Sequence, residues 1–70
     1  MIRVIEIDSS LKPLYKPGDF IKKGAYLGLT SDLNGAVFSA FSGKIISMTP
    51  NIENQVVSLE IEEFDEDMLL

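Results

Sequence analysis

The chain is 70 residues long, which is enough for one small domain with a thin hydrophobic core. It contains no cysteine and no histidine, so neither a disulfide framework nor the usual soft metal ligands can stabilise it. A hydrophobic content of 46% with a charged content of 24% is typical of a folded globular domain. The net charge of -5 disfavours nucleic acid as a partner, because binding to phosphates depends on a basic surface.

No apolar run approaches the roughly 20 residues that a membrane-spanning helix needs, and the opening MIRVIEID has no apolar core of signal-peptide length. We therefore expect no membrane insertion and a cytoplasmic location. The chain also lacks the glycine-rich phosphate-binding motifs and the calcium-loop pattern. We expect no cofactor and no bound metal.

Glycine and proline interrupt the chain at short intervals from Pro13 onward. The runs between these breaks are about four to eight residues long, which favours short strands over helices. We expect an all-β fold of short antiparallel strands, with no helix longer than about one turn. The expected strands lie at residues 2–7, 20–21, 26–30, 36–41, 44–48 and 55–62.

The clearest strand is the stretch 55–62, where Val57, Leu59 and Ile61 alternate with polar residues. Successive side chains of a strand point to opposite faces, so this pattern directs the apolar set inward. The same reasoning, applied to the other strands, predicts the core. Its expected members are Val4, Ile21, Leu27, Leu29, Val37, Ile45, Val57, Leu59 and Ile61.

Two glycine turns carry much of the local information. In the first, proline presets φ, Gly18 accepts a positive φ, and the Asp19 side chain can accept hydrogen bonds from nearby backbone N–H groups. Ser42-Gly43 is expected to reverse the chain similarly, with a positive φ at Gly43. Asn34-Gly35 predicts a type I′ hairpin turn. The predicted structural turn residues are Pro17, Gly18, Asp19, Gly24, Asn34, Gly35, Ser42 and Gly43.

Three segments share a pattern with a known fold family: 18–24 (GDFIKKG), 38–45 (FSAFSGKI) and 56–62 (VVSLEIE). They resemble the biotinyl/lipoyl-like barrel-sandwich hybrid, and within it the small segments of the A subunit of sodium-pumping NADH:quinone reductase and the C subunit of the Rnf complex. The chain departs from that pattern at Ala40, where these families usually have proline. The resemblance implies a small barrel-sandwich hybrid domain at residues 1–62 with a scaffold or docking role. It carries over no catalytic residue.

Carrier proteins of this fold display their modified lysine at a hairpin tip, and the matching position here is Asp32. A carboxylate cannot form the amide that attaches biotin or lipoate. Lys22, Lys23 and Lys44 lie beside the structural turns and are expected to be ordinary solvated side chains. The resemblance therefore implies a domain without the carrier function. At the exposed tip, Asp32→Ala is expected to change stability very little.

An enzymatic role is disfavoured, because the chain has serines but no histidine to act as a general base. Asp8, Asp19 and Asp32 are isolated, so no pair of carboxylates for acid–base chemistry is evident. We rank a non-catalytic, stand-alone protein-binding or scaffold module first, with a redox complex as one setting. A divergent biotin or lipoyl carrier ranks second, and a small enzyme last.

The expected partner is another protein or a second copy of the chain. Aromatic side chains are enriched at the centres of protein interfaces, so Tyr15, Tyr26, Phe38 and Phe64 are the predicted anchors. Residues 63–70 are assigned to an acidic C-terminal tail. The stretch 60–67 holds six of the 11 acidic residues, a density typical of a solvated chain end.

Overall fold

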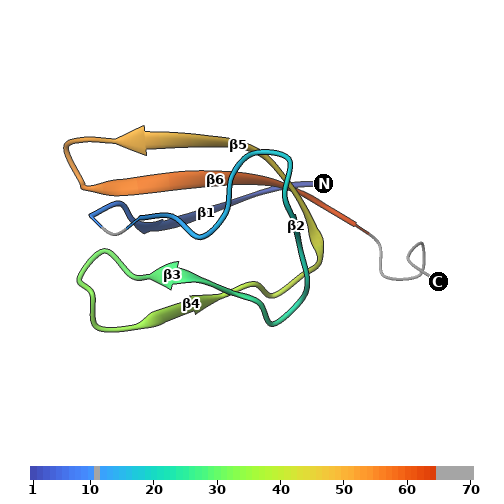
Figure 1. Ribbon diagram of the computed structural model, residues 1–70, viewed down its shortest axis with the longest axis horizontal. Helices are drawn as coiled ribbons and strands as arrows, with labels where there is room; N and C mark the ends of the chain where they lie inside the picture. Colours follow the sequence, from blue (N-terminus) through green and yellow to red (C-terminus); the bar gives the residue numbers. More distant parts are fainter. Residues whose placement is uncertain (11, 65–70) are drawn as a thin grey trace.

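The computed structural model describes residues 1–10 and 12–64 (Figure 1). These residues form six strands and no helix. The strands are β1 (Ile2–Asp8), β2 (Phe20–Ile21), β3 (Tyr26–Leu29), β4 (Ala36–Phe38), β5 (Gly43–Asn51) and β6 (Val56–Glu63). The prediction of a small all-β fold of short antiparallel strands is confirmed.

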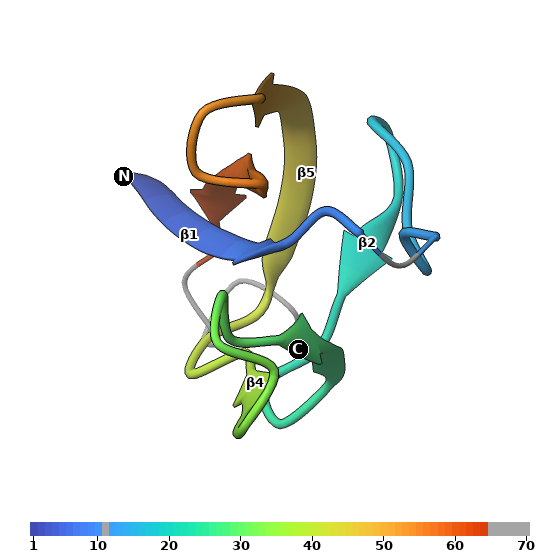
Figure 2. The ribbon, with the colours of Figure 1, turned by 90° about the vertical axis from the view of Figure 1, so that its left-hand side faces the viewer.

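The strands form one curled four-stranded sheet and one hairpin. The larger sheet has the order β1-β6-β5-β2, and each of its pairs is antiparallel. β3 and β4 form a separate two-stranded sheet that faces the curled sheet (Figure 1, Figure 2). The domain is therefore a small half-barrel with a hairpin packed against it.

The hydrophobic core lies between the half-barrel and the hairpin, because both elements direct apolar side chains toward the same interior. Its buried members are Ile7, Ile21, Leu27, Ile45, Val57, Leu59 and Ile61. Of the remaining predicted core residues, Val37 is partly buried and packs against this cluster, and Leu29 is partly buried. The prediction missed Ile7 and the buried Val56.

The predicted inward position of Val4 is wrong, because this side chain is 62% exposed. β1 pairs with β6 so that Ile5 lies opposite Leu59 and Val4 lies opposite Glu60. Residues directly opposite each other share one face of a sheet, so Ile5 points to the core and Val4 points away from it. The opening MIRVIEID has apolar residues on both faces, and only the pairing with β6 decides between them.

The main differences in strand length concern the middle of the chain. β4 ends at Phe38, earlier than expected, and β5 continues through Pro50 to Asn51. A register shift after Ile45 marks a β-bulge at Ile46. Pro50 lies opposite Val57, whose backbone groups are directed toward β1, so the missing N–H of proline removes no hydrogen bond to β6.

The two glycine turns differ in a way that the sequence did not show. Gly18 has a φ of 98°, as predicted, and the Asp19 carboxylate accepts a hydrogen bond from the Lys16 N–H at 3.0 Å. The predicted positive φ at Gly43 is wrong. A Cβ at Gly43 would instead lie 2.4 Å from the carbonyl oxygen of Glu62, because β5 and β6 approach closely there. Glycine is needed at position 43 for space.

The predicted type I′ turn at Asn34-Gly35 is also wrong, because the left-handed residue of this loop is Leu33, with a φ of 63°. The Thr30 N–H donates to the Gly35 carbonyl at 2.8 Å, and the Leu33 N–H donates to the Thr30 carbonyl at 2.9 Å. The loop is therefore longer than a type I′ turn, and the residue with positive φ shifts toward the N-terminus.

The last strand extends one residue past the predicted residue 62. β6 ends at Glu63, and the Phe64 N–H donates to the Ser42 carbonyl at 2.8 Å. The first residues of the predicted tail thus belong to the packed domain. The rest of that tail, residues 65–70, lies outside the described residues.

Candidate functional site

The hairpin tip that the resemblance aligns with the carrier lysine is the loop between β3 and β4. Asp32 is exposed there, and its Oδ1 accepts hydrogen bonds from the Thr30 hydroxyl at 2.5 Å and the Asn34 N–H at 3.0 Å. The Thr30 oxygen in turn accepts a hydrogen bond from the Gly35 N–H at 3.1 Å. Asp32 therefore helps to close the loop, a local role that the sequence analysis did not assign to it.

The same contacts set the charge at the tip. The Thr30 hydroxyl, followed by the Asn34 N–H, stabilises the ionised carboxylate and holds the pKa of Asp32 below its ordinary value of 3.8. No lysine occurs in the loop, and Lys22, Lys23 and Lys44 are exposed elsewhere on the domain. The tip thus presents a carboxylate where a carrier would present an amine.

The turn between β4 and β5 is held by serine hydroxyls. The buried Ser39 hydroxyl donates to the carbonyl of Phe41, and the Ser42 oxygen accepts a hydrogen bond from the Lys23 N–H at 3.0 Å. The Gly24 N–H also donates to the Ser39 carbonyl, at 2.7 Å. These bonds join the two glycine-containing turns of the family-like pattern. They give both serines a structural role.

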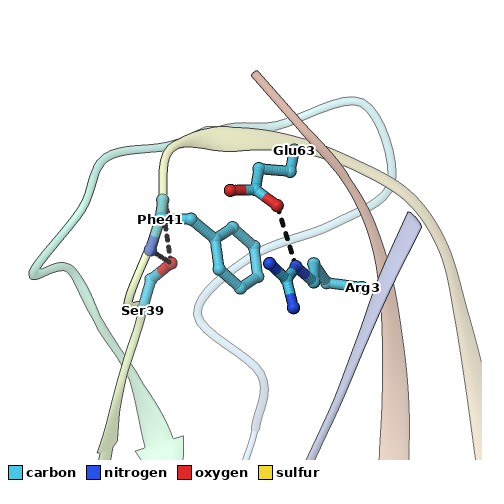
Figure 3. A network of polar contacts seen from close by, with 4 residues as sticks. All are labelled: Arg3, Ser39, Phe41 and Glu63. Atoms are coloured by element: carbon cyan, nitrogen blue, oxygen red, sulfur yellow. Dashed lines mark hydrogen bonds and ion pairs between the residues drawn. The ribbon is translucent and has the colours of Figure 1, made fainter. Parts of the chain in front are cut away.

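An arginine side chain links the start of β1 and the end of β6 to this turn (Figure 3). The Arg3 Nε donates to a Glu63 carboxylate oxygen at 2.8 Å, and the guanidinium lies 5.6 Å from the centre of the Phe41 ring. The pair is partly exposed, so its contribution to stability is modest. The Glu63 carboxylate thus neutralises the charge of Arg3, which lies on the inner face of β1.

The hairpin carries an exposed aromatic pair on its outer side. Tyr26 lies opposite Phe38, and the ring centres are 5.7 Å apart at an interplanar angle of 61°. This edge-to-face arrangement is a favourable one for aromatic rings. Tyr26 is nevertheless 39% exposed and Phe38 is 59% exposed. The pair is an apolar contact surface supplied by β3 and β4.

A pocket beside this pair is too small for an ordinary ligand. It has a volume of about 110 Å³ and is lined by residues that include Ile7, Lys12, Leu14, Tyr26 and Leu29. Pockets for cofactors and drug-sized molecules usually measure about 300–1,000 Å³.

A second aromatic pair lies at the short edge strand β2. Phe20 is 67% exposed, its ring centre lies 5.8 Å from that of Phe64, and the Lys44 ammonium lies 5.8 Å from the Phe20 ring centre. The adjoining pocket, lined in part by Ile21 and Gly43, has a volume of about 160 Å³. It too is smaller than an ordinary ligand pocket.

The four predicted interface anchors therefore occupy three different environments. Tyr26 and Phe38 lie together on the hairpin, Tyr15 is partly buried against the core, and Phe64 is partly buried against Phe20. Phe20 was not among the predicted anchors. The strand β2 that carries it is too short for alternation to show which of its residues points outward.

The acidic residues singled out in the sequence remain separate in space. The Asp8 carboxylate is buried and accepts hydrogen bonds from the N–H and hydroxyl of Ser10, whereas Asp19 and Asp32 each accept bonds within their own turns. Among residues 1–10 and 12–64, no group of three or more acidic side chains is arranged to hold a metal ion.

The chain matches no family model, no curated protein and no solved structure. The described part of the chain contains no helix that is long and apolar enough to span a membrane. The likeness to the biotinyl/lipoyl-like family therefore rests on the segments 18–24, 38–45 and 56–62 alone.

Proposed function

We propose that this domain is a non-catalytic protein-binding module of the biotinyl/lipoyl-like kind, and that the hairpin β3–β4 contacts its partner. The observation that carries the proposal is the exposed pair Tyr26 and Phe38. Large aromatic side chains bury much apolar area at little conformational cost, and they often supply most of the binding energy of an interface. A partner that covers both rings would remove this exposed apolar surface from water.

The hairpin tip supports a role other than that of a carrier. Asp32 occupies the position that the resemblance assigns to the modified lysine, and its hydrogen bonds to Thr30 and Asn34 lower its pKa further, which favours the ionised form. The family likeness also indicates where a partner is to be sought. Since the similar segments belong to sodium-pumping NADH:quinone reductase and the Rnf complex, subunits of such redox complexes are the first partners to test.

The proposal is tested by placing a photo-activated cross-linking amino acid at position 38 and, as a matched control, at position 52. Ile52 is 89% exposed and lies between β5 and β6, outside the hairpin. We expect a partner to be captured from the native cell through position 38 only. With that partner purified, Phe38→Ala should weaken binding by about tenfold or more, whereas Ile52→Ala should leave it unchanged.

Equal binding of the Phe38→Ala variant and the unchanged domain would contradict the proposal. A second measurement addresses the carrier alternative directly. The domain is expressed together with a biotin ligase or a lipoate ligase, and its intact mass is determined. We expect no added mass, and a biotinyl or lipoyl adduct on any lysine would show that the domain is a carrier.

A further inference from the structure

β1 is an outer strand of the curled sheet. It pairs with β6 along one side, and no strand among the described residues pairs with its other side (Figure 2). Near the end of β1, Ile7 packs closely against Gly28 of β3. Along the preceding part of the strand, from Ile2 to Glu6, no strand of residues 1–10 and 12–64 pairs with the outer edge.

The hydrogen bonds at the two ends of β1 show which backbone groups lie on the free edge. The Glu63 N–H donates to the Met1 carbonyl at 2.9 Å, and the Ser9 N–H donates to the Gln55 carbonyl at 2.9 Å. The bonding direction alternates along an antiparallel pair, so odd-numbered residues of β1 bond to β6. Ile2, Val4 and Glu6 direct their N–H and C=O groups away from the sheet.

Several devices that usually prevent a strand from pairing with other chains are absent from β1. The strand has seven residues in regular register, with no proline, no lysine and no bulge. Its inward-facing Arg3 is a charge of the kind that protects an edge, but it is paired with Glu63 inside the domain. The edge is thus long enough and regular enough to accept another strand.

The outer face beside this edge combines apolar and acidic side chains. Ile2 and Val4 are exposed, and Val4 lies opposite Glu60, which lies opposite Ser47. Across this row of the sheet, no cation faces Glu60.

The next row is also acidic at the edge. Glu6 lies opposite Ser58, which lies opposite Thr49. By contrast, Glu62 lies opposite Lys44, so a cation faces it across the sheet. Glu6 and Glu60 therefore provide negative charge on the outer face near the free edge without a facing cation.

We propose that the free edge of β1 binds an extended segment of another protein that alternates apolar residues with lysine or arginine. The segment adds a strand to the sheet and bonds to the backbone groups of Ile2, Val4 and Glu6. Successive side chains of a strand point to opposite faces, so the cations of the segment lie on the outer face near Glu6 and Glu60, with their aliphatic stems over Ile2 and Val4. Its apolar side chains lie on the inner face beside Ile5. A second copy of the chain suits this edge less well, because it would bring the same unbalanced glutamates together at a net charge of -5 per chain.

The probe is a peptide of the same length as β1 in which lysine and valine alternate, and the control peptide has glutamate in place of lysine. Binding is followed by NMR on the isotopically labelled domain. We expect the lysine peptide to bind and the glutamate peptide not to bind. Bound peptide should slow hydrogen exchange at the amides of Ile2, Val4 and Glu6, and increasing salt should weaken binding.

Val4→Pro is the decisive variant, because it removes an N–H on the free edge and leaves the ladder to β6 intact. Val4→Thr is its matched control, since threonine keeps the N–H and the branched Cβ. We expect Val4→Pro to weaken peptide binding by about tenfold or more, and Val4→Thr to retain most of it. Glu60→Gln should weaken binding by about two- to fivefold.

Equal binding by Val4→Pro and the unchanged domain would overturn the inference. If Val4→Pro does not fold, the test is made on the unchanged domain. Peptide that slows hydrogen exchange at the amides of Leu59 or Ile45, without any change at the amide of Val4, would also overturn the inference. A dimer of the unliganded chain that Val4→Thr preserves and Val4→Pro dissociates would assign the edge to a second copy. Phe38→Ala should leave peptide binding unchanged, so the hairpin proposal and this inference fail independently.

Discussion

The two faces of the curled sheet are built from the same strands and have opposite roles. On the inner face of β6, Val57, Leu59 and Ile61 are buried in the core. On the outer face, the intervening Glu60 and Glu62 lie among exposed apolar residues that include Val4. The inner face stabilises the domain, whereas side chains on the outer face, such as Val4 and Glu62, remain exposed.

This difference shows that a hydrophobic residue in a strand does not by itself identify the core. Ile5 and Val4 are neighbours of similar hydrophobicity, yet only Ile5 packs against the core cluster. Substitutions on the two faces should therefore differ greatly in their effect on the free energy of unfolding.

The largest effect is expected for Leu59→Ala on the inner face. Leu59 is fully buried, and its removal leaves a cavity between the half-barrel and the hairpin. The free energy of unfolding should fall by about 2–5 kcal/mol, a large share of the stability of so small a domain. Urea denaturation measures the change. A loss below about 1 kcal/mol would mean that the two faces differ less than their burial indicates.

The next largest effect is expected for Gly43→Ala, where β5 and β6 approach closely. The added methyl group would lie 2.4 Å from the Glu62 carbonyl oxygen and 2.8 Å from the Ile61 Cγ2, so β5 and β6 must shift apart. The free energy of unfolding should fall by about 1–3 kcal/mol. NMR should also show changed amide shifts along both strands at this end. A substitution without either change would contradict the close approach.

Gly18→Ala should have a smaller effect, since nothing lies within 4 Å of the added methyl group. The loss arises from the positive φ of 98°, and it should be about 1 kcal/mol. Thermal denaturation of the two glycine variants side by side separates the causes. A larger loss at Gly18 than at Gly43 would mean that the positive φ at Gly18 costs more than the close approach at Gly43.

On the outer face, Val4→Ala should change the free energy of unfolding by no more than about 0.5 kcal/mol. The side chain is exposed and lies opposite Glu60, so its truncation leaves no cavity. Urea denaturation alongside Leu59→Ala makes the comparison direct. A loss as large as that of Leu59→Ala would place Val4 in the core and overturn the register between β1 and β6.

The smallest effect concerns the hairpin tip. The pKa of Asp32 should lie below 3.8 in the folded domain, because the Thr30 hydroxyl and the Asn34 N–H bind its ionised form. Since the folded pKa is lowered, these bonds stabilise the loop above the ordinary pKa and are lost as the pH falls through the lower folded value. An NMR titration should show Thr30→Val raising the pKa of Asp32, with Ser31→Ala as the control. An unchanged pKa in Thr30→Val would contradict this role for the hydroxyl.

The sequence alone determined the features that depend on neighbouring residues. The spacing of glycine and proline excluded long helices, the alternation at Val57, Leu59 and Ile61 identified the inner face of β6, and Gly18 marked a turn with positive φ. The lack of lysine at the hairpin tip is likewise visible in the sequence. Each of these is a local property, since periodicity and turn chemistry act over a few residues.

Only the tertiary structure decided the features that depend on distant strands. The orientation of β1 follows from its register with β6, and the need for glycine at position 43 follows from the approach of Glu62. The pairing of Tyr26 with Phe38 and the free edge of β1 likewise depend on strand order. A strand with apolar residues on both faces has no preferred side until a partner strand fixes its register, because a shift of one residue exchanges the two faces.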